Sequence, residues 1–438
     1  MDMNEKGRMR AKTLIKATLG RTPVWPYVLK GRFYASRYLD GGVALLERIL
    51  NRVAVRFVSP QKVKDLLNSR DFYGKEYFDS EKNPFQESGY AEAYDENPDF
   101  QEVARLARDL LGARRALDVG CAKGFLVQAL LRAGVDAWGT DISEYAIGQA
   151  PPEVRERLWQ ADLVNADLPE DEYDLVLALE VLEHIPPGEI AAAVANLRRC
   201  TSRYIWATIP SYGPNPYGLD GWLEGKILPR KMRLYREHLI DLAELHHMTY
   251  DIRGLPIHGH LIAASFDWWT ALFTSLGFVR RGDLERVINR ELRSAREGIW
   301  DCFLLEKVRP APASTSVELE SGDFRQNTGG AWACTGVLLP AGIYRATVRV
   351  RLDGNLEGKR KNERVLTLAC LSEDGERIYG MRLPTRREVE SKACDRSLEL
   401  DWIISSDGTG PVTFRLDPTP GTRLDPIGAS IVPGGQDP

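Results

Sequence analysis

The stretch from Ala116 to Gly124, ALDVGCAKG, constrains the fold of this chain more than any other. Its first half is apolar enough for a buried strand, and its second half is small and rich in glycine. From Phe125 the apolar residues recur at helical spacing until Gly134. A glycine-rich turn between a strand and a helix lets the backbone approach a ligand closely, because glycine has no Cβ. The stretch predicts a ligand-binding loop, and the segments after it decide which kind.

Acidic residues follow the next two strands that the sequence predicts. A short strand over Ala137 to Thr140 ends in Asp141, about twenty residues beyond the loop, where a doubly wound nucleotide-binding fold places an acid for ribose hydroxyls. Asp162 follows a third segment. A fourth strand, over Tyr173 to Leu179, leads into the letters EVLEHI. The spacing favours an open parallel sheet with its site at the carboxyl edge.

With these motifs the chain resembles the class I S-adenosylmethionine-dependent methyltransferases, in the branch with the V-L-E-H signature. The resemblance covers roughly residues 90–308 and implies a Rossmann-like, seven-stranded α/β domain with S-adenosylmethionine as cofactor. It places the glycine-rich loop under the methionine part of the cofactor, Asp141 at the ribose and Asp162 at the adenine amino group. The cofactor-binding residues that it implies are Asp118, Gly120, Cys121, Ala122, Gly124, Asp141, Ile142, Asp162, Leu163 and Glu180. Ala122 stands where the family usually has glycine, and its extra methyl predicts a small shift of the loop.

The segment after the fifth predicted strand, Ser211 to Pro256, is an insert with many glycines, prolines and aromatic residues. Loops at the carboxyl edge of a parallel sheet are where such folds bind substrates. Exposed tyrosine and tryptophan are suited to stacking on sugar rings, and equally to plain packing. The residues expected to contact the substrate are Tyr212, Tyr217, Trp222 and His258.

Two histidines are candidates for the general base that an oxygen acceptor requires. His184 closes the V-L-E-H signature, and His260 follows the insert, so both are expected at the mouth of the cleft. An alternative for His184 is a role in shaping the cleft, because the signature recurs in relatives that act on different atoms. Glu180, Glu183 and His184 would share a helical face and could hold a metal if the stretch is helical. Hard cations need several oxygen ligands, the sequence offers no second cluster, and no metal is predicted.

The two ends of the chain differ in composition from its middle. Residues 1–60 carry twelve Lys or Arg against four Asp or Glu, with a predicted amphipathic helix. This segment, within a helical region 1–70, either contacts an anionic membrane surface or packs against the catalytic domain, predicted over 71–308. Residues 309–316, RPAPASTS, predict a linker. Short alternating strands over 317–438 predict an antiparallel β-sandwich.

The sandwich loosely resembles carbohydrate-binding modules, through the phrase PAGIYRATVRVRL. Trp332 and Trp402 are either platforms for sugar rings or members of the core. The linker predicts that residues 1–308 fold and bind cofactor without the sandwich.

Composition narrows the class of protein further. A net charge of −4 over 438 residues gives no support to a nucleic-acid binder. The six cysteines show no metal-binding spacing, which favours a reducing cytoplasm, and no apolar run reaches the roughly 18 residues of a membrane span. The sequence therefore predicts a cytoplasmic methyltransferase, peripheral at the inner membrane face if the basic segment binds lipid, that O-methylates a sugar hydroxyl in glycan or polysaccharide biosynthesis. The alternatives are a tailoring methyltransferase for a small metabolite or sugar nucleotide, and a non-catalytic adaptor, against which the intact loop and acids argue.

Overall fold

The computed structural model describes residues 73–78, 98–212, 239–241, 260–295, 301–309, 315–353, 363–392 and 397–434, together with residues 356, 359 and 361. Contacts divide the chain into two units, Met1–Ala93 with Leu242–Leu261, and Tyr94–Asp241 with Ile262–Pro438. In the first unit, the short helix α5 (Lys75–Phe78) carries an edge-to-face contact between the rings of Tyr77 and Phe78. The predicted basic segment 1–60 lies outside the described residues, as do Tyr217, Trp222 and His258.

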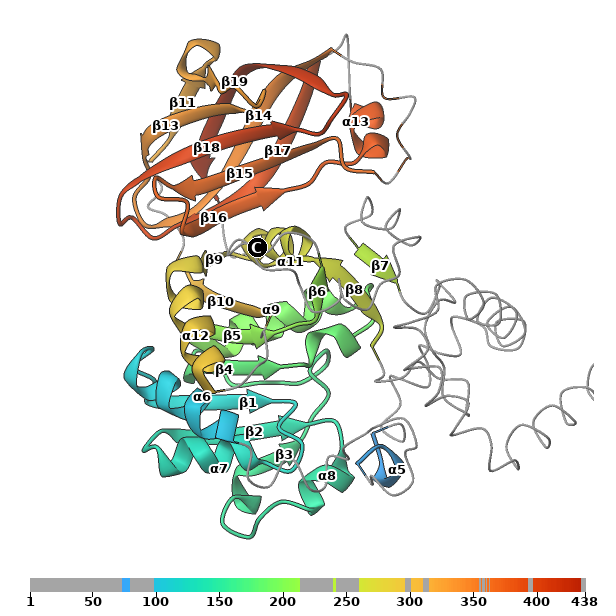
Figure 1. The fold of residues 1–438 in the computed structure, drawn as a ribbon, viewed down its shortest axis with the longest axis vertical. Helices are drawn as coiled ribbons and strands as arrows, with labels where there is room; N and C mark the ends of the chain where they lie inside the picture. The colour runs from blue at the N-terminus through green and yellow to red at the C-terminus, as the bar shows by residue number, and fades with distance from the viewer. Residues whose placement is uncertain are drawn as a thin grey trace, which may run out of the picture. The chain divides into compact units, whose positions relative to one another are not determined.

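The second unit is built on a parallel sheet with β1 (Arg115–Val119) at its centre. On one side of β1 lie β2 (Asp136–Asp141) and β3 (Leu158–Gln160), and on the other lie β4 (Tyr173–Leu179) and β5 (Thr201–Thr208), all parallel. Two antiparallel pairings then add β10 (Cys302–Lys307) and β9 (Phe278–Arg281), as Figure 1 shows. The order β9-β10-β5-β4-β1-β2-β3 confirms the predicted seven-stranded Rossmann-like sheet.

Helices cover both faces of this sheet, because its strands are buried on both sides. Along β4, Leu175 and Leu177 belong to one hydrophobic cluster, and Val176 and Ala178 to the other. The first cluster includes residues of α6 (Pro98–Asp109), α7 (Phe125–Arg132) and α12 (Gly282–Ala295). The second includes residues of α9 (Ile190–Cys200) and α11 (Phe266–Ser275). Burial on both faces explains the near-continuous apolar runs of the central strands.

Three short strands form a separate small sheet that begins just beyond the carboxyl end of β5. They are β6 (Ser211–Tyr212), β7 (Leu239–Asp241) and β8 (Ile262–Ser265), in the order β6-β8-β7. The small helix α8 (Glu144–Gly148) follows β2, capped by the Ser143 hydroxyl, which accepts a hydrogen bond from the Ala146 N–H at 3.0 Å. The carboxyl edge is therefore where the chain places its irregular segments.

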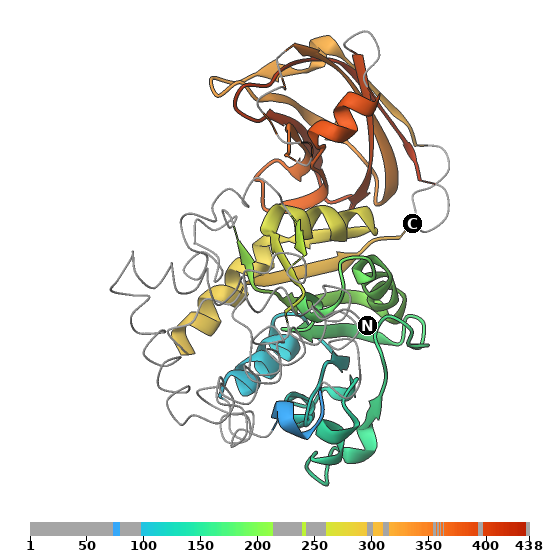
Figure 2. The ribbon, with the colours of Figure 1, turned by 90° about the vertical axis from the view of Figure 1, so that its right-hand side faces the viewer.

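The C-terminal part is the antiparallel β-sandwich that the sequence predicts. One sheet has the order β11-β19-β14-β17 and the other β12-β13-β18-β15-β16, and in Figure 2 the strands curve around a common interior. Between β14 and β17, Val348 and Leu400 point into the core, while Arg349 and Glu399 are exposed. The elements are β11 (Val317–Glu320), β12 (Arg325–Gln326), β13 (Trp332–Leu338), β14 (Gly342–Asp353), β15 (Leu366–Ser372), β16 (Arg377–Arg382), α13 (Arg386–Lys392), β17 (Ser397–Ser406), β18 (Pro411–Pro418) and β19 (Arg423–Pro433).

The sandwich and the methyltransferase-like sheet share hydrogen-bonded strands. β16 pairs antiparallel with β9, with Arg377 opposite Arg281 and Ile378 opposite Arg280. The pairing makes one sheet of 12 strands, which crosses from one part to the other in Figure 1. The sequence predicts a linker at 309–316 and gives no indication of this connection.

Candidate active site

The glycine-rich loop leaves β1 at its carboxyl end and enters α7. Gly120 and Gly124 have φ angles of 74° and 78°, in the region that favours glycine. A Cβ on Gly120 would lie 2.5 Å from Cγ2 of Val181, and one on Gly124 would lie 2.7 Å from Cδ1 of Leu158. Both glycines are therefore required by conformation and by space.

Ala122 adopts a left-handed conformation as well, with φ of 47°. Its N–H donates a 2.8 Å hydrogen bond to Oδ2 of Asp141, while Oδ1 of Asp141 accepts one from the Ser143 N–H at 2.7 Å. Asp141 thus fastens the loop to the end of β2. Because each carboxylate oxygen has two lone pairs, both oxygens retain capacity for a ligand hydroxyl.

Two carboxyl groups are buried beside this loop, at the ends of neighbouring strands. Asp118 is 4% exposed and Asp141 is 9% exposed. Burial raises the pKa of Asp118 well above its ordinary value, and the charge of Asp141 adds to this effect. Burial also raises the pKa of Asp141. A cationic group bound here would favour the charged forms of both acids.

The remaining predicted cofactor residues lie around the same edge. Asp162 follows β3 and shapes its own turn, accepting hydrogen bonds from the Val164 N–H at 3.0 Å and from the Asn165 amide at 2.7 Å. The Ile142 carbonyl, just beyond β2, accepts one from the Gln160 amide at 2.9 Å. Cys121 and Leu163 are buried. The structure thus gathers the predicted residues at the carboxyl ends of β1, β2 and β3.

The turn after β4 differs from the helical face considered from the sequence. Glu180 is exposed, has φ of 57°, and donates its N–H to the Thr208 carbonyl at 2.9 Å. Only Leu182–His184 form a helical turn, a 3-10 turn of 3 residues. Glu180 therefore stands outside the helical turn that contains Glu183 and His184. The left-handed residue at position 180 breaks the helical spacing.

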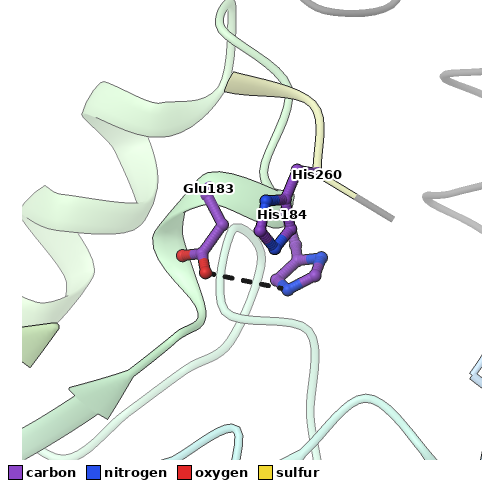
Figure 3. A group of neighbouring side chains, drawn as sticks. All are labelled: Glu183, His184 and His260. Carbon is purple, nitrogen blue, oxygen red and sulfur yellow. Dashed lines mark ion pairs between the residues drawn. The ribbon is translucent and has the colours of Figure 1, made fainter. Parts of the chain in front are cut away.

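Glu183, His184 and His260 form a group of neighbouring side chains, drawn in Figure 3. One ligand atom from each lies within 4.8 Å of the others, and Oε1 of Glu183 is 3.9 Å from Nε2 of His184. Glu183 is fully buried, which raises its pKa well above its ordinary value, and the charges of Glu180 and Asp301 contribute. The two histidines predicted as alternative bases therefore lie together. Two imidazoles and a carboxyl are suited to accepting a proton, and also to holding a divalent cation.

Two members of this region were missed by the sequence analysis as site residues. Asp301 directly precedes β10 and accepts a 2.8 Å hydrogen bond at Oδ2 from the Ser211 N–H, and its carbonyl accepts one from the Ile209 N–H at 3.0 Å. It thereby holds the start of β6, the strand that contains Tyr212. Glu183 was considered only as a metal ligand. Nothing local marks Asp301, because the residues that it contacts come from distant parts of the chain, whereas Glu183 lies in the V-L-E-H signature and only its neighbour His260 is distant in sequence.

The aromatic side chains of the sandwich are directed into its core. Trp402 is 7% exposed and packs edge to face with Phe414 at 6.2 Å. Trp332 is half-buried, and its indole N–H donates to the Leu424 carbonyl at 3.0 Å. The other aromatic residues after position 316 are buried: Phe324, Tyr344 and Tyr379. Trp402 is thus a core residue, and the sandwich offers little aromatic surface for a sugar ring.

Known proteins resemble the part of the chain that contains the glycine-rich loop and the V-L-E-H signature. A protein family described as "Methyltransferase domain" matches residues 117–203. Ubiquinone biosynthesis O-methyltransferase of Methylococcus capsulatus is 37% identical over 24% of this chain and 46% of its own length. Magnesium-protoporphyrin O-methyltransferase of a Synechocystis species is 30% identical over 36% of this chain and 70% of its own length. The chain belongs to the class I S-adenosylmethionine-dependent methyltransferases.

The extent of these matches is limited. The present chain spans about half of the ubiquinone biosynthesis O-methyltransferase, 46% of its length. Among solved structures, magnesium protoporphyrin IX methyltransferase from Synechocystis with bound SAH is 18% identical, covering 54% of this chain and 97% of that chain with a TM-score of 0.34.

In the described part of this chain, no helix combines the length and apolar character that crossing a membrane requires.

The residues at the loop fit the cofactor of this family. S-adenosylmethionine carries a sulfonium and an ammonium group, and the buried carboxyls of Asp118 and Asp141 offer opposite charge at the loop. Gly120 carries no side chain at the turn, where a Cβ would collide with Val181. The loop of this methyltransferase would therefore hold the methionine part, with Asp141 available to ribose hydroxyls.

Proposed function

We propose that this methyltransferase transfers a methyl group to a hydroxyl oxygen, with His184 or His260 accepting the hydroxyl proton. The observation that carries the proposal is the group of Glu183, His184 and His260 just beyond the carboxyl end of β4. Both relatives described above are named O-methyltransferases, which supports an oxygen acceptor.

The chemistry requires orientation and removal of one proton. S-adenosylmethionine supplies the methyl group on a sulfonium sulfur. The acceptor oxygen forms its bond to the methyl carbon as the carbon–sulfur bond breaks, and the hydroxyl proton passes to an imidazole nitrogen. A positioned base contributes roughly 10²–10⁴-fold to the rate, and orientation of two bound reactants is worth about 7–11 kcal/mol in favourable cases.

The acceptor that we propose first is a sugar hydroxyl of a glycan or polysaccharide. Its support is the aromatic insert, with Tyr212, Tyr217 and Trp222, which is suited to stacking on sugar rings. A small-molecule hydroxyl is the second candidate, and two observations favour it. The names of both relatives refer to small molecules, ubiquinone and magnesium-protoporphyrin, and the aromatic residues of the sandwich face its core.

A transfer assay with representative acceptors tests the proposal. The full-length protein is incubated with radiolabelled S-adenosylmethionine and either methyl glucoside, a soluble dextran or catechol, and the products are identified by mass spectrometry. We expect an O-methylated product from one acceptor class and none with Asp141→Ala, which removes the loop fastening. Methylation at nitrogen or carbon in a wider panel would contradict the oxygen assignment, and transfer to catechol alone would select the small-molecule candidate.

A further inference from the structure

The sandwich contacts the methyltransferase sheet at the strand that would otherwise form its edge. β9 has β10 on one side and β16 on the other, so the sandwich takes the open hydrogen-bonding edge. Side chains reinforce the joint: Arg377 of β16 reaches Asp283 of α12 at 3.6 Å and Asp407 of the sandwich at 2.7 Å. Arg281 of β9 binds Asp283 at 2.7 Å. The joint therefore combines backbone pairing with a shared set of charges.

Helix α11 is held by the sandwich near both of its ends. Near its start, Asp267 pairs with Nη1 of Arg364 at 3.0 Å, and the same nitrogen donates to the Thr367 hydroxyl at 2.9 Å. In its last turn, the buried Thr274 hydroxyl accepts a hydrogen bond from the Met381 N–H at 3.1 Å. Figure 1 shows α11 alongside β16, between the sandwich and the methyltransferase sheet. Two contacts at opposite ends fix both the position and the direction of a helix.

The two parts also share one hydrophobic core at this joint. Val279 of β9 and Val308, just after β10, belong to the hydrophobic cluster of the sandwich. In the turn from α11 to β9, a Cβ on Gly277 would lie 3.1 Å from Cδ1 of Ile343, on β14. Such a core resists sliding of one part against the other, because close-packed side chains transmit strain.

The same helix follows directly after β8. We call β6 and β8 the acceptor edge, because β6 contains Tyr212, which is expected to contact the substrate, and β8 begins just after His260. Ser265 ends β8 and caps α11, its hydroxyl accepting a hydrogen bond from the Trp268 N–H at 3.1 Å. β8 pairs with β6, where Ser211 is also bonded to Asp301. A shift of α11 therefore moves β8, and with it the pairing that places β6.

We infer that the sandwich positions the acceptor edge of the methyltransferase through α11, and that Arg364 is the positioning residue of this connection. The inference takes from the proposed function only that β6 and β8 border the acceptor. Arg364 acts through Asp267, without a direct role in the chemistry. The sandwich is in this respect a part of the site's framework, whatever the acceptor is.

Hydrogen exchange of the full-length protein tests the inference without a known acceptor. Arg364→Ala removes the ion pair between Arg364 and Asp267, whose side chains are partly exposed. Loss of such a pair should raise the equilibrium constant for local opening about fivefold. We expect amides of 211–212 and 262–268 to exchange about fivefold faster. Exchange in β1 to β4 and calorimetric affinity for S-adenosylhomocysteine should stay unchanged. The swapped pair Asp267→Arg with Arg364→Asp should restore slow exchange.

Arg415→Ala is the matched control, because Arg415 pairs with Asp417 at 2.8 Å on β18, within the sandwich. It should leave β6 and β8 as in the wild type. Unchanged exchange at 262–268 in Arg364→Ala, equal acceleration throughout the sheet, or an effect that the swapped pair does not reverse would overturn the inference. Failure of the wild type to bind S-adenosylhomocysteine would instead count against the cofactor assignment, and the exchange result would still decide the inference.

Discussion

Gly120 combines a left-handed backbone with a lack of space for any side chain. We expect Gly120→Ala to lower the free energy of unfolding by about 1–3 kcal/mol and to weaken S-adenosylhomocysteine binding, because the new methyl meets Val181. Gly134 separates the two causes, since it has φ of 88° but nothing within 4 Å of an added Cβ. Gly134→Ala should cost only about 1 kcal/mol from strain and leave binding intact. Urea unfolding and calorimetry measure both, and equal losses in the two variants would contradict the role of the collision.

Asp118 gives the cofactor-free protein a specific pH dependence. Its pKa is raised in the folded state, so its contribution to the free energy of unfolding is largest below the unfolded pKa of about 3.9. This contribution decreases as pH rises toward the folded pKa. Asp118→Asn removes that decrease, and we expect the variant to be more stable than the wild type at neutral pH but to bind cofactor more weakly. Urea unfolding across pH 5–8 checks this, and a variant that is less stable at every pH would disprove it.

The proton acceptor is a question of single side chains as well. Replacing the base, His184 or His260, by alanine should lower kcat by ~10²-fold or more and leave cofactor affinity nearly unchanged, because the loss falls on the transition state. The other histidine should matter less, and each variant is the control for the other. If both variants keep near-full turnover, the base lies elsewhere. If a chelator abolishes activity and magnesium restores it, a metal activates the hydroxyl, with Glu183, His184 and His260 the first ligands to test.

At the scale of elements, the joint between β9 and β16 depends on charges that titrate in acid. Burial alone would raise the pKa of Asp283 and Asp407, but hydrogen bonds from Arg281 to Asp283 and from Thr409 to Asp407, together with the charge of Arg377, lower the pKa of each. Carboxyl groups of this kind stabilise the fold above their unfolded pKa, and this stabilisation is lost as pH falls through the folded pKa. Arg377→Met should lower the free energy of unfolding by about 1–2 kcal/mol at neutral pH and by less in acid. Arg132→Met is the control, because Arg132 is 68% exposed and its ion pair with Glu153 is 3.8 Å long. This substitution should leave the free energy of unfolding unchanged.

Elements also show what the sequence was able to predict. The loop after β1 and the strands beside it followed from apolar runs, glycines and acids at their ends, which are local signals, whereas the seven-stranded sheet was implied by the family resemblance that these motifs carry. Both histidines were expected at the mouth of the cleft from their positions in the chain, but their grouping with Glu183 was not predicted, because nothing local links the signature to a histidine far along the chain. The β9–β16 pairing left no pattern at all, since it consists of two residue pairs between Arg280–Arg281 and Arg377–Ile378. Short edge pairings are set by packing around them, which one sequence does not display.

At the scale of the whole molecule, the structure changes the expectation for a truncated chain. Residues 1–308 were predicted to fold and bind cofactor alone. The truncation would uncover β9 along its edge and expose Val279 and Val308. We now expect the fragment to unfold at lower urea concentration and to self-associate in analytical ultracentrifugation. A monomeric fragment with the urea midpoint of the full chain would contradict this expectation.

The shared sheet has a consequence for synthesis on the ribosome. β9 emerges long before its partner, because the residues from Gly282 to Glu376 must be added before β16 exists. At about 5–20 residues per second, the edge of β9 stays unpaired for on the order of 5–20 s. During that interval a nascent chain presents an open strand edge to neighbouring chains. Speed of translation through the segment that follows β9 should therefore influence how much of this protein reaches its native state.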